Sequence, residues 1–261
     1  MTALVCVLGP SGRMGKALLD AAVGRMDVRI SAAVDRPESG VISTQVAPGV
    51  TARTDLSAAF EACDVYIDFT SPEATRVAAQ AATPLRRAAV IGTTGLDKDH
   101  EYAIAQLAAV APVVVAANFS LGVNMLLGLV KQAARALGTD WDAEVVETHH
   151  HSKRDAPSGT ALAIARAIAD GHGSDYDRVK RHSRDGDIGA RRNGEIGVQS
   201  VRGGDVVGEH MVSFFGAGER LELAHRATTR SIFAVGALRA AAWVVGKPSG
   251  RYDMLDVLGL K

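Results

Sequence analysis

Residues 147–160 concentrate the side chains of this chain that could carry out chemistry. Three consecutive histidines, His149 to His151, and Lys153 stand at the end of an alternating apolar run over residues 143–148. A Pro-Ser-Gly-Thr sequence then leads into a helical pattern, so we expect a strand, a loop rich in proton donors and a helix N-terminus. Backbone amides at a helix N-terminus attract anions. The segment therefore suits a small substrate that carries carboxylates and takes up a proton.

Two other interpretations of this segment remain open. A histidine run can bind a metal, but along a strand His149 and His151 would share one face and His150 the other. No pair of ligands follows at zinc spacing, so we expect no metal site. The segment could also be a solvated loop with Ser158 as the helix N-cap. That interpretation explains Ser158 but not the clustering of Lys153 with the histidines.

A glycine-rich turn follows the first apolar run of the chain. Residues 3–8 form an uninterrupted apolar segment of strand length, and residues 16–23 have helical spacing. A glycine turn between strand and helix is the context of a dinucleotide-binding fingerprint, because glycines let the backbone approach a pyrophosphate closely. The spacing G-x-x-G-x-x-G departs from the commoner G-x-G-x-x-G, and an ordinary turn with incidental glycines is the alternative. The residues expected to bind the cofactor here are Gly9, Pro10, Ser11, Gly12, Arg13, Met14 and Gly15.

A second predicted strand, over residues 28–34, is followed by Asp35 and Arg36. Asp35 comes about 20 residues after the last glycine of the turn, where an acidic residue is expected to bind the ribose hydroxyls. Its carboxylate would repel a 2′-phosphate, whereas Arg36 can pair with one or stack on adenine. We therefore expect NADH or NADPH as the cofactor, with both tolerated and NADH no worse than NADPH.

Strands and helices alternate up to about residue 120. Strands are predicted over residues 64–70, 88–92 and 112–117, with helices over 71–82 and 97–109. This alternation indicates an α/β fold with a Rossmann-like, doubly wound parallel sheet. Ligands of such sheets bind beyond the carboxyl ends of the strands. The strand-end residues expected to line the nicotinamide side are Phe69, Thr70, Gly92, Thr93, Thr94, Ala116, Ala117, Asn118 and Phe119.

The pattern changes after residue 120. A long helix over 123–137 precedes the histidine strand, and a charged, glycine-rich stretch over 171–193 is expected to be an exposed loop with solvated basic residues. Strands then follow one another without helices, over 196–202, 210–215 and 220–227, the last two joined by a Gly-Ala-Gly hairpin turn. This indicates a second, α+β domain with an antiparallel or mixed sheet.

The last helix, over residues 231–244, and the tail over 252–260 could return to the first lobe. We therefore expect a dinucleotide-binding domain of residues 1–120 plus 231–261. Residues 121–230 would form the substrate-binding and oligomerisation domain. Hinges near residues 120 and 230 are expected if the two domains move.

Composition excludes several classes of protein. The 261 residues carry 29 basic and 29 acidic side chains, so no net field favours nucleic acid or anionic lipid. No basic leader and no apolar stretch of membrane-spanning length is present, and the cytoplasm is the expected location. Cys6 and Cys63 lie in or beside predicted buried strands and are interpreted as reduced core thiols. Their position also argues against a semialdehyde dehydrogenase, which needs a nucleophilic cysteine.

The chain closely resembles, over almost its full length, the 4-hydroxy-tetrahydrodipicolinate reductase (dihydrodipicolinate reductase) family of the bacterial and plant diaminopimelate pathway to lysine. The pattern H-H-x-x-K-x-D-A-P-S-G-T, which begins at His149, is the most specific feature. Minor departures are Pro10 and Ser11 in the glycine turn and His151-Ser152 before Lys153. The stretches that carry the resemblance are residues 9–15, 92–95, 118–124, 147–161, 202–210 and 219–222.

The resemblance implies reduction of 4-hydroxy-tetrahydrodipicolinate to tetrahydrodipicolinate with NADH or NADPH. His149 matches the family's general acid/base and Lys153 its proton donor. The substrate-binding positions match His150, Gly159 and Thr160, and the family's assembly implies a homotetramer built through the sheet of the second domain. The alternative is a catalytically silent, nicotinamide-nucleotide-binding regulator on the same scaffold, which would have no need of His149 and Lys153.

Overall fold

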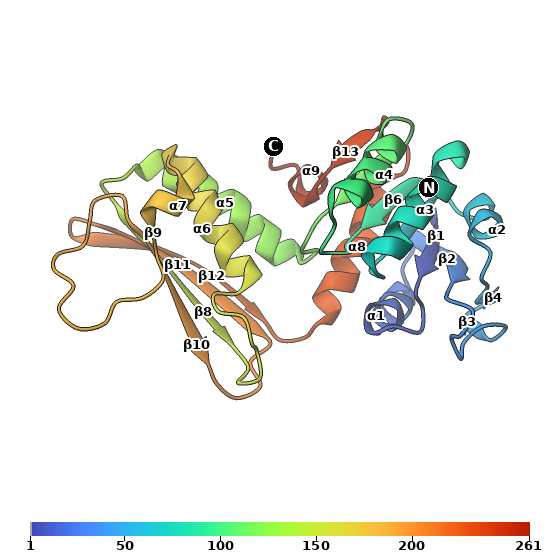
Figure 1. Ribbon diagram of the computed structural model, residues 1–261, viewed down its shortest axis with the longest axis horizontal. Coiled ribbons are helices and arrows are strands. Elements are labelled where there is room, and N and C mark those ends of the chain that lie inside the picture. Colours follow the sequence, from blue (N-terminus) through green and yellow to red (C-terminus); the bar gives the residue numbers. More distant parts are fainter. Residues whose placement is uncertain (1) are drawn as a thin grey trace. The chain divides into compact units, whose positions relative to one another are not determined.

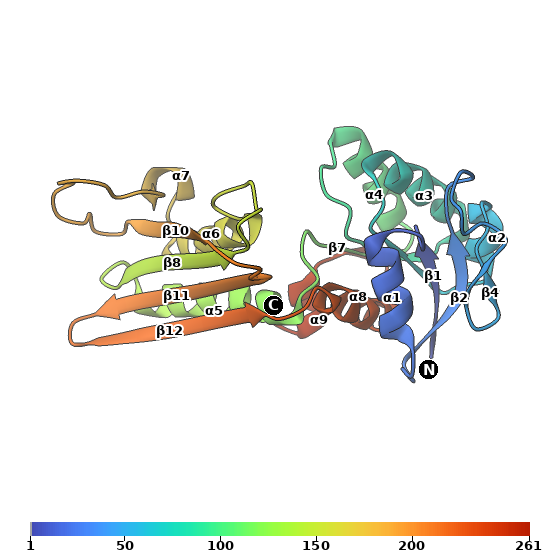
Figure 2. The ribbon, with the colours of Figure 1, turned by 90° about the horizontal axis from the view of Figure 1, so that it is seen from below.

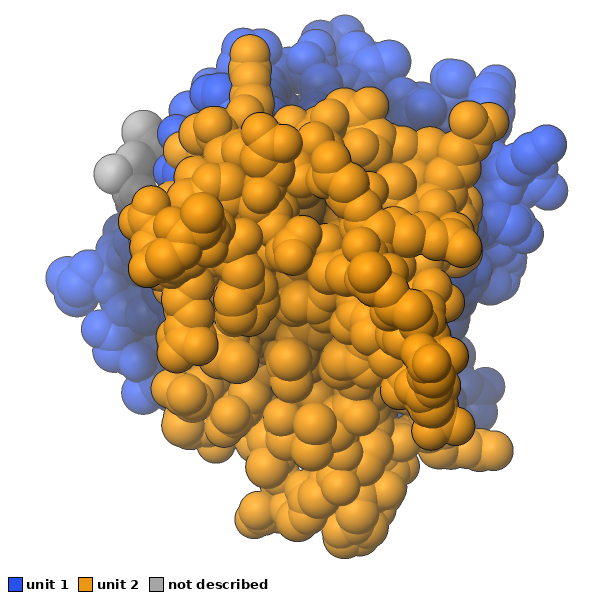
Figure 3. All heavy atoms as spheres, turned by 90° about the vertical axis from the view of Figure 1, so that its left-hand side faces the viewer, with its two compact units in different colours: residues 1–121, 231–261 blue, residues 122–230 orange. Residues whose placement is uncertain are grey.

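The computed structural model describes residues 2–261, which form two compact units. The first unit runs to Leu121 and resumes at Ser231, and the second comprises Gly122–Arg230. Figure 1 shows the elements of both units, and Figure 3 colours the units separately. No helix within the described residues is long and apolar enough to cross a membrane.

A six-stranded parallel sheet forms the centre of the first unit. Its order is β13-β7-β6-β5-β1-β2. The chain builds outward from β1 in one direction and from β5 in the other, so the winding reverses between these two neighbours. This confirms the predicted doubly wound sheet. The strands are β1 (Ala3–Leu8), β2 (Val28–Val34), β5 (Val65–Asp68), β6 (Ala88–Ile91), β7 (Pro112–Val115) and β13 (Gly250–Tyr252).

Both faces of this sheet are buried, which explains why its strands read as continuous apolar runs. Val5 and Val7 of β1 pack in a cluster with Leu238 of α8, whereas Cys6 packs in a second cluster with Ile104 of α4. Cys6 and Cys63 are both free and buried, as predicted. The helices of the unit are α1 (Arg13–Ala22), α2 (Leu56–Glu61), α3 (Pro72–Leu85), α4 (Lys98–Ala108), α8 (Ser231–Val244) and α9 (Met254–Leu258).

The second unit contains a mixed five-stranded sheet in the order β12-β11-β8-β10-β9. Strands β8, β10 and β9 run parallel, and β11 is antiparallel to β8 and β12. Helices α5 (Leu121–Leu137) and α6 (Gly159–His172) cover one face, as Figure 2 shows, around a core that includes Val145, Ile164 and Phe214. The strands are β8 (Asp142–His149), β9 (Lys180–Arg181), β10 (Ile196–Arg202), β11 (Gly208–Gly216) and β12 (Glu219–Ala227).

The prediction of a solvated loop over residues 171–193 is wrong in part. Helix α6 extends to His172, and α7 (Tyr176–Val179) and β9 follow. Two arginines of the remaining loop are half-buried, because their guanidinium groups pair with carboxylates of the sheet. Arg184 donates to both oxygens of Glu144 at 2.9 and 2.7 Å, and Arg191 donates to Asp142 at 2.6 Å. This loop is drawn at the left of Figure 1.

The C-terminal elements match the prediction, whereas three short elements near the N-terminus were not predicted. Helix α8 has its predicted bounds, and the tail returns to the first unit, where β13 pairs with β7. The short hairpin of β3 (Gln45–Ala47) and β4 (Val50–Thr51) and the helix α2 were not predicted.

Candidate active site

Strand β8 ends at His149, which corrects the expected alternation of the three histidines. Burial alternates along β8, with Val145, Glu147 and His149 on the side of the helices. His150 and His151 lie beyond the strand, so the face of His151 is not set by strand geometry. His151 is exposed and its Nδ1 lies 2.9 Å from the carbonyl oxygen of Gly204. Of the three, only His149 is buried.

The buried carboxylate of Glu147 orients the imidazole of His149. His149 Nδ1 lies 2.5 Å from Glu147 Oε2. Two guanidinium N–H groups of Arg202 donate to the two oxygens of Glu147, each at 2.8 Å, and the backbone N–H of Ser158 donates at 3.1 Å. Burial opposes ionisation, but the hydrogen bonds from Arg202, Ser200, His149 and the Ser158 amide prevail and lower the pKa of Glu147 to about 2.

An ionised Glu147 fixes the tautomer of His149. A carboxylate only accepts hydrogen bonds, so the proton of the neutral imidazole is assigned to Nδ1. Nε2 is then the atom that can exchange a proton with a substrate. It lies against Gly208 of β11, where an added Cβ would come within 3.0 Å of Nε2. A glycine at 208 therefore keeps this atom uncrowded.

A second buried histidine, His210, lies beside the first. The rings of His149 and His210 meet edge to face with centroids 5.3 Å apart. The Ser158 hydroxyl accepts from the N–H of Ala161 at 3.1 Å, so its own hydrogen is available for His210 Nε2, 3.2 Å away. Burial, reinforced by the charges of His149 and Lys153, lowers the pKa of His210 to about 4 and keeps it neutral near pH 7.

Lys153 lies in the loop that joins β8 to α6. Its ammonium group pairs with Asp155 at 2.9 Å, and its backbone N–H donates to the carbonyl of His150. Arg202 also reaches this loop and donates to the backbone carbonyl of Asp155 at 2.7 Å. The loop is held further by the backbone N–H of His150, which donates to Val206 at 2.8 Å. These hydrogen bonds and the ion pair therefore fix the loop that carries Lys153.

Helix α6 begins beside these groups. Ser158 is its N-cap, as the sequence indicates, and Gly159 and Thr160 are its first two residues. A side chain at Gly159 would meet nothing within 4 Å, so the helix start faces open space. The structure thus brings His149, the Lys153 loop and the predicted carboxylate-binding end of α6 to the carboxyl end of β8.

The glycine turn of the first unit has the geometry that a pyrophosphate needs. Gly9 has φ +70°, and a Cβ at Gly15 would lie 2.0 Å from the carbonyl oxygen of Gly9, so only glycine lets α1 start this close to the turn. The N-cap of α1 is Gly12, which makes no side-chain capping bond to the first-turn amides. Amides of this kind at a helix start form an anion site. Arg13 next to them is exposed.

Asp35 is already tied to this turn. Its carboxylate accepts from the backbone N–H of Ser11 and from that of Arg36, each at 2.9 Å. Burial works against ionisation, but the hydrogen bonds from Ser11 and Arg36 prevail and lower the pKa of Asp35. The charged carboxylate therefore stands between the glycine turn and the exposed Arg36, where a ribose diol could donate to it.

Two of the strand-end residues, Thr70 and Thr93, bind a buried carboxylate, that of Asp68. It accepts from the Thr70 and Thr75 hydroxyls at 2.5 and 2.6 Å and from the Thr93 hydroxyl at 3.3 Å. The hydroxyl of Thr93 is thus engaged inside the protein, which leaves its backbone for any contact with a cofactor. Phe69 packs edge to face on the buried Phe119, and an added Cβ at Gly92 would lie 2.1 Å from the Phe69 ring.

Both halves of the chain match models of one family. The N-terminal model of dihydrodipicolinate reductase matches residues 3–119, and the C-terminal model matches residues 122–258. The chain belongs to the dihydrodipicolinate reductase family.

Relatives within this family cover nearly the whole chain. The 4-hydroxy-tetrahydrodipicolinate reductase of Geobacter metallireducens is 45% identical over 98% of this chain and 99% of its own length. That of Cereibacter sphaeroides is 48% identical over 98% of each. A solved structure, the dipicolinate-bound dihydrodipicolinate reductase from Paenisporosarcina sp. TG-14, superposes with a TM-score of 0.83 at 25% identity and covers 98% of this chain and 99% of its own.

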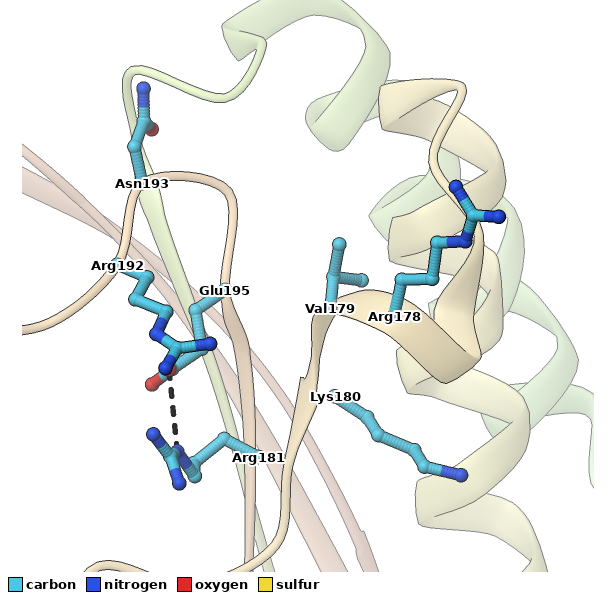
Figure 4. A pocket seen from close by; sticks show the side chains of 7 residues that line it. All are labelled: Arg178, Val179, Lys180, Arg181, Arg192, Asn193 and Glu195. Carbon is cyan, nitrogen blue, oxygen red and sulfur yellow. Dashed lines mark hydrogen bonds and ion pairs between the residues drawn. The ribbon is translucent and has the colours of Figure 1, made fainter.

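A hollow of about 210 Å³ lies beside the start of β10, at the end of the second sheet away from His149, and Figure 4 shows its lining. It is lined by Arg178, Lys180, Arg181, Arg192 and Glu195, together with Val179 and Asn193. The basic side chains do not converge on one point. Arg181 is paired with Glu195, and Arg178 and Lys180 point away from that pair. This hollow therefore lacks the arrangement of an anion site.

Three residues of the histidine site had no role assigned from the sequence. Glu147, Arg202 and His210 fall within the stretches that resemble the family, but their types alone did not single them out. Glu147 could have been found from the sequence, because it is a carboxylate at a core-facing position of a strand whose residues alternate between buried and half-buried. Among residues 2–261, no cluster of three or more His, Cys, Asp or Glu side chains is arranged to hold a metal ion.

Proposed function

We propose that this protein reduces 4-hydroxy-tetrahydrodipicolinate to tetrahydrodipicolinate with NADH or NADPH, in the diaminopimelate pathway of lysine biosynthesis. The observation that supports this most directly is the buried Glu147, which holds His149 and the start of α6 and reaches the Lys153 loop through Arg202. Such a combination of acid, cation and helix start suits a dicarboxylate whose reduction consumes a proton.

The reaction replaces a hydroxyl group by hydrogen. A hydride and a proton enter, and the hydroxyl leaves as water. The nicotinamide, when bound, supplies the hydride. The reaction also needs a proton donor and positive charge to bind the two carboxylates of the substrate. We assign both to side chains and backbone groups of the second unit.

Proton exchange and substrate binding are assigned to different groups of this site. We assign proton exchange at Nε2 to His149, because Nδ1 is committed to Glu147. Lys153 carries a charged ammonium group that can donate a proton or pair with a carboxylate. Gly159 and Thr160, at the positive end of the α6 dipole, and His150 are assigned to substrate binding.

The cofactor residues remain those of the sequence prediction. The turn from Gly9 to Gly15 would hold the pyrophosphate at the start of α1, with Arg13 beside it. Asp35 would accept from the ribose hydroxyls, and the exposed Arg36 would pair with a 2′-phosphate when NADPH binds. The nicotinamide half would lie along the strand ends formed by Phe69, Gly92, Thr93, Thr94, Ala116, Ala117, Asn118 and Phe119.

We also propose a homotetramer in the cytoplasm. The face of the second sheet that α5 and α6 do not cover presents Val201, Met211 and Phe215, each between 37% and 47% exposed. Large apolar side chains on an open sheet face favour association. Two free buried thiols, Cys6 and Cys63, support a reducing compartment.

A direct assay tests the function. Pyruvate and aspartate semialdehyde are condensed to give fresh substrate, and the loss of nicotinamide absorbance is followed after addition of the protein. We expect turnover with either cofactor. A protein that binds NADH tightly but gives no absorbance loss would instead support the alternative, a silent nucleotide-binding regulator.

A further inference from the structure

The carboxylate of Glu147 joins three parts of the histidine site. Its side chain is fully buried and receives hydrogen bonds from His149, from two N–H groups of Arg202 and from the backbone of Ser158. A buried ion pair is poor evidence of a stabilising role, because well-packed apolar replacements are often as stable. Stability alone therefore does not explain why a buried Glu147–Arg202 ion pair contacts His149.

We propose that Glu147 is a positioning residue for the reduction, which acts through His149 and through Arg202. This inference rests on the proposed function and adds a residue to it. The carboxylate holds the Nδ1–H of His149, so that Nε2 is the atom presented for proton exchange. Buried carboxylates that orient a functional imidazole in this way occur in other enzymes, where they also stabilise the imidazolium form.

Arg202 extends the same control to the loop of Lys153. Its Nη2 donates both to Glu147 Oε1 and to the backbone carbonyl of Asp155, at 2.8 and 2.7 Å. The side chain of Asp155 in turn pairs with the ammonium group of Lys153. A displacement of Glu147 would therefore reach both proton-bearing residues, and through the Ser158 amide it would also reach the start of α6.

The carboxylate of Glu147 is also the counter-charge for an imidazolium at position 149. The charged or titratable groups that contact His149 or its partner carboxylate are Glu147 on its own strand, His210 on β11 and Arg202 on β10. Lys153 in the following loop adds positive charge near His210. Of these, only Glu147 is negative, and its pKa of about 2 keeps it charged throughout the working range of pH. Glu147→Gln removes this counter-charge and leaves a neutral amide beside the imidazole of His149.

Glu147→Gln tests the proposal, with Glu144→Gln as the matched control. Glu144 stands on the same strand and pairs with a guanidinium group, that of Arg184, but lies on the other face of the sheet. Steady-state rates are measured from about pH 5.5 to 9 with saturating cofactor, NADH binding is measured by fluorescence, and folding by circular dichroism.

We expect Glu147→Gln to lower kcat by roughly 10- to 100-fold or more, the lower range being that for loss of the carboxylate partner of a metal-bound histidine. NADH affinity should stay nearly unchanged. The limb of the pH–rate profile that reports His149 should move to lower pH by about one unit or more. Glu144→Gln should keep the kcat and the pH profile of the wild type.

A folded Glu147→Gln variant with wild-type kcat and an unmoved pH profile would overturn the proposal. If the single variant does not fold because Arg202 is left unpaired, the double variant Glu147→Gln with Arg202→Met removes both charges. The folded double variant should show the same displaced profile and reduced kcat, and wild-type values for both would again refute the inference. Absence of turnover in the wild type would contradict the proposed function instead.

Discussion

Strand β8 carries two carboxylate–guanidinium pairs with different consequences. Glu144 pairs with Arg184 on the open face and closes the loop that follows β9. Glu147 pairs with Arg202 on the covered face and holds His149. The residue types and the pairing geometry are nearly the same, so the face of the strand decides whether the carboxylate also orients an imidazole.

At the scale of residues, the proton-bearing groups can be separated by alanine substitution. Lys153→Ala should lower kcat by roughly two to four decades, the range for loss of a positioned acid, with NADH binding nearly intact. His149→Ala should also lower kcat. His150→Ala should act mainly on KM, because a group that binds ground and transition states alike changes binding only.

His151→Ala is the internal control, because His151 is exposed and bonds only to the backbone carbonyl of Gly204 among the described contacts. The measurement is kcat at saturating substrate and cofactor for each of the four variants. A crippled His151→Ala together with a normal Lys153→Ala would show that the site has been wrongly assigned.

Cofactor choice also belongs to single residues. Asp35 is held by the amides of Ser11 and Arg36, so its carboxylate is fixed where a ribose would meet it. Arg36→Ala should therefore weaken NADPH binding more than NADH binding, since only NADPH carries a 2′-phosphate for the guanidinium to pair with. Dissociation constants for both cofactors provide the test, with Arg13→Ala as a comparison. Equal losses for the two cofactors would contradict the role given to Arg36.

At the scale of elements, long periodic segments could be predicted from the sequence and short ones could not. Helix α8 is an almost uninterrupted apolar run of 14 residues and strand β10 has seven residues, and both have their predicted bounds. Strands β3 and β4 and the six-residue helix α2 are too short to carry such a pattern.

The same limit applies to the site. His149, Lys153 and the N-cap Ser158 are close in the sequence, so their proximity could be predicted from one segment. Arg202 lies 55 residues from Glu147, and only the parallel pairing of β8 with β10 brings the two together. The ion pairs of Arg184 and Arg191 with the sheet also span 40 residues or more, which is why their loop was expected to be solvated.

The attachment of α6 to the sheet makes stability depend on pH in two windows. Burial lowers the pKa of His210 from 6.5 to about 4, so between these values the unfolded chain binds more protons than the folded one. The unfolding free energy is therefore complete above pH 6.5 and falls as pH drops towards 4, by at most about 3 kcal/mol for this group. The second window belongs to Glu147, whose pKa falls from 4.5 to about 2. Its contribution to the unfolding free energy is lost as the pH drops from 4.5 towards 2.

Urea unfolding of the wild type and of His210→Gln at pH 7.5 and pH 4.5 separates this contribution. The variant stays neutral, so its stability should fall less between the two values of pH. His172 and His225, whose pKa values burial also lowers, act in the same direction and remain in both proteins. Equal losses in the wild type and the variant would mean that His210 is not the group responsible.

At the scale of the whole molecule, the second unit has helices on one face of its sheet only. Met211 and Phe215 point to the other face in register with Val146 and Asp142 of β8. Because β11 lies between β8 and β12, these side chains stand within the sheet and not at its edge. An apolar strip in that position is expected to be covered by another copy of the chain, since burial of apolar surface drives association.

Met211→Arg should therefore break the assembly without unfolding the chain. The added charge lies on the open face, where it would be buried and unpaired in an oligomer but solvated in a monomer. Light scattering at micromolar concentration should give about four times the 27.2 kDa of one chain for the wild type and a smaller mass for the variant. Met26→Arg is the control, because Met26 is 87% exposed in the first unit and should leave the mass unchanged. A wild-type mass equal to one chain would refute the tetramer, and a tetrameric Met211→Arg would show that the copies meet through another surface.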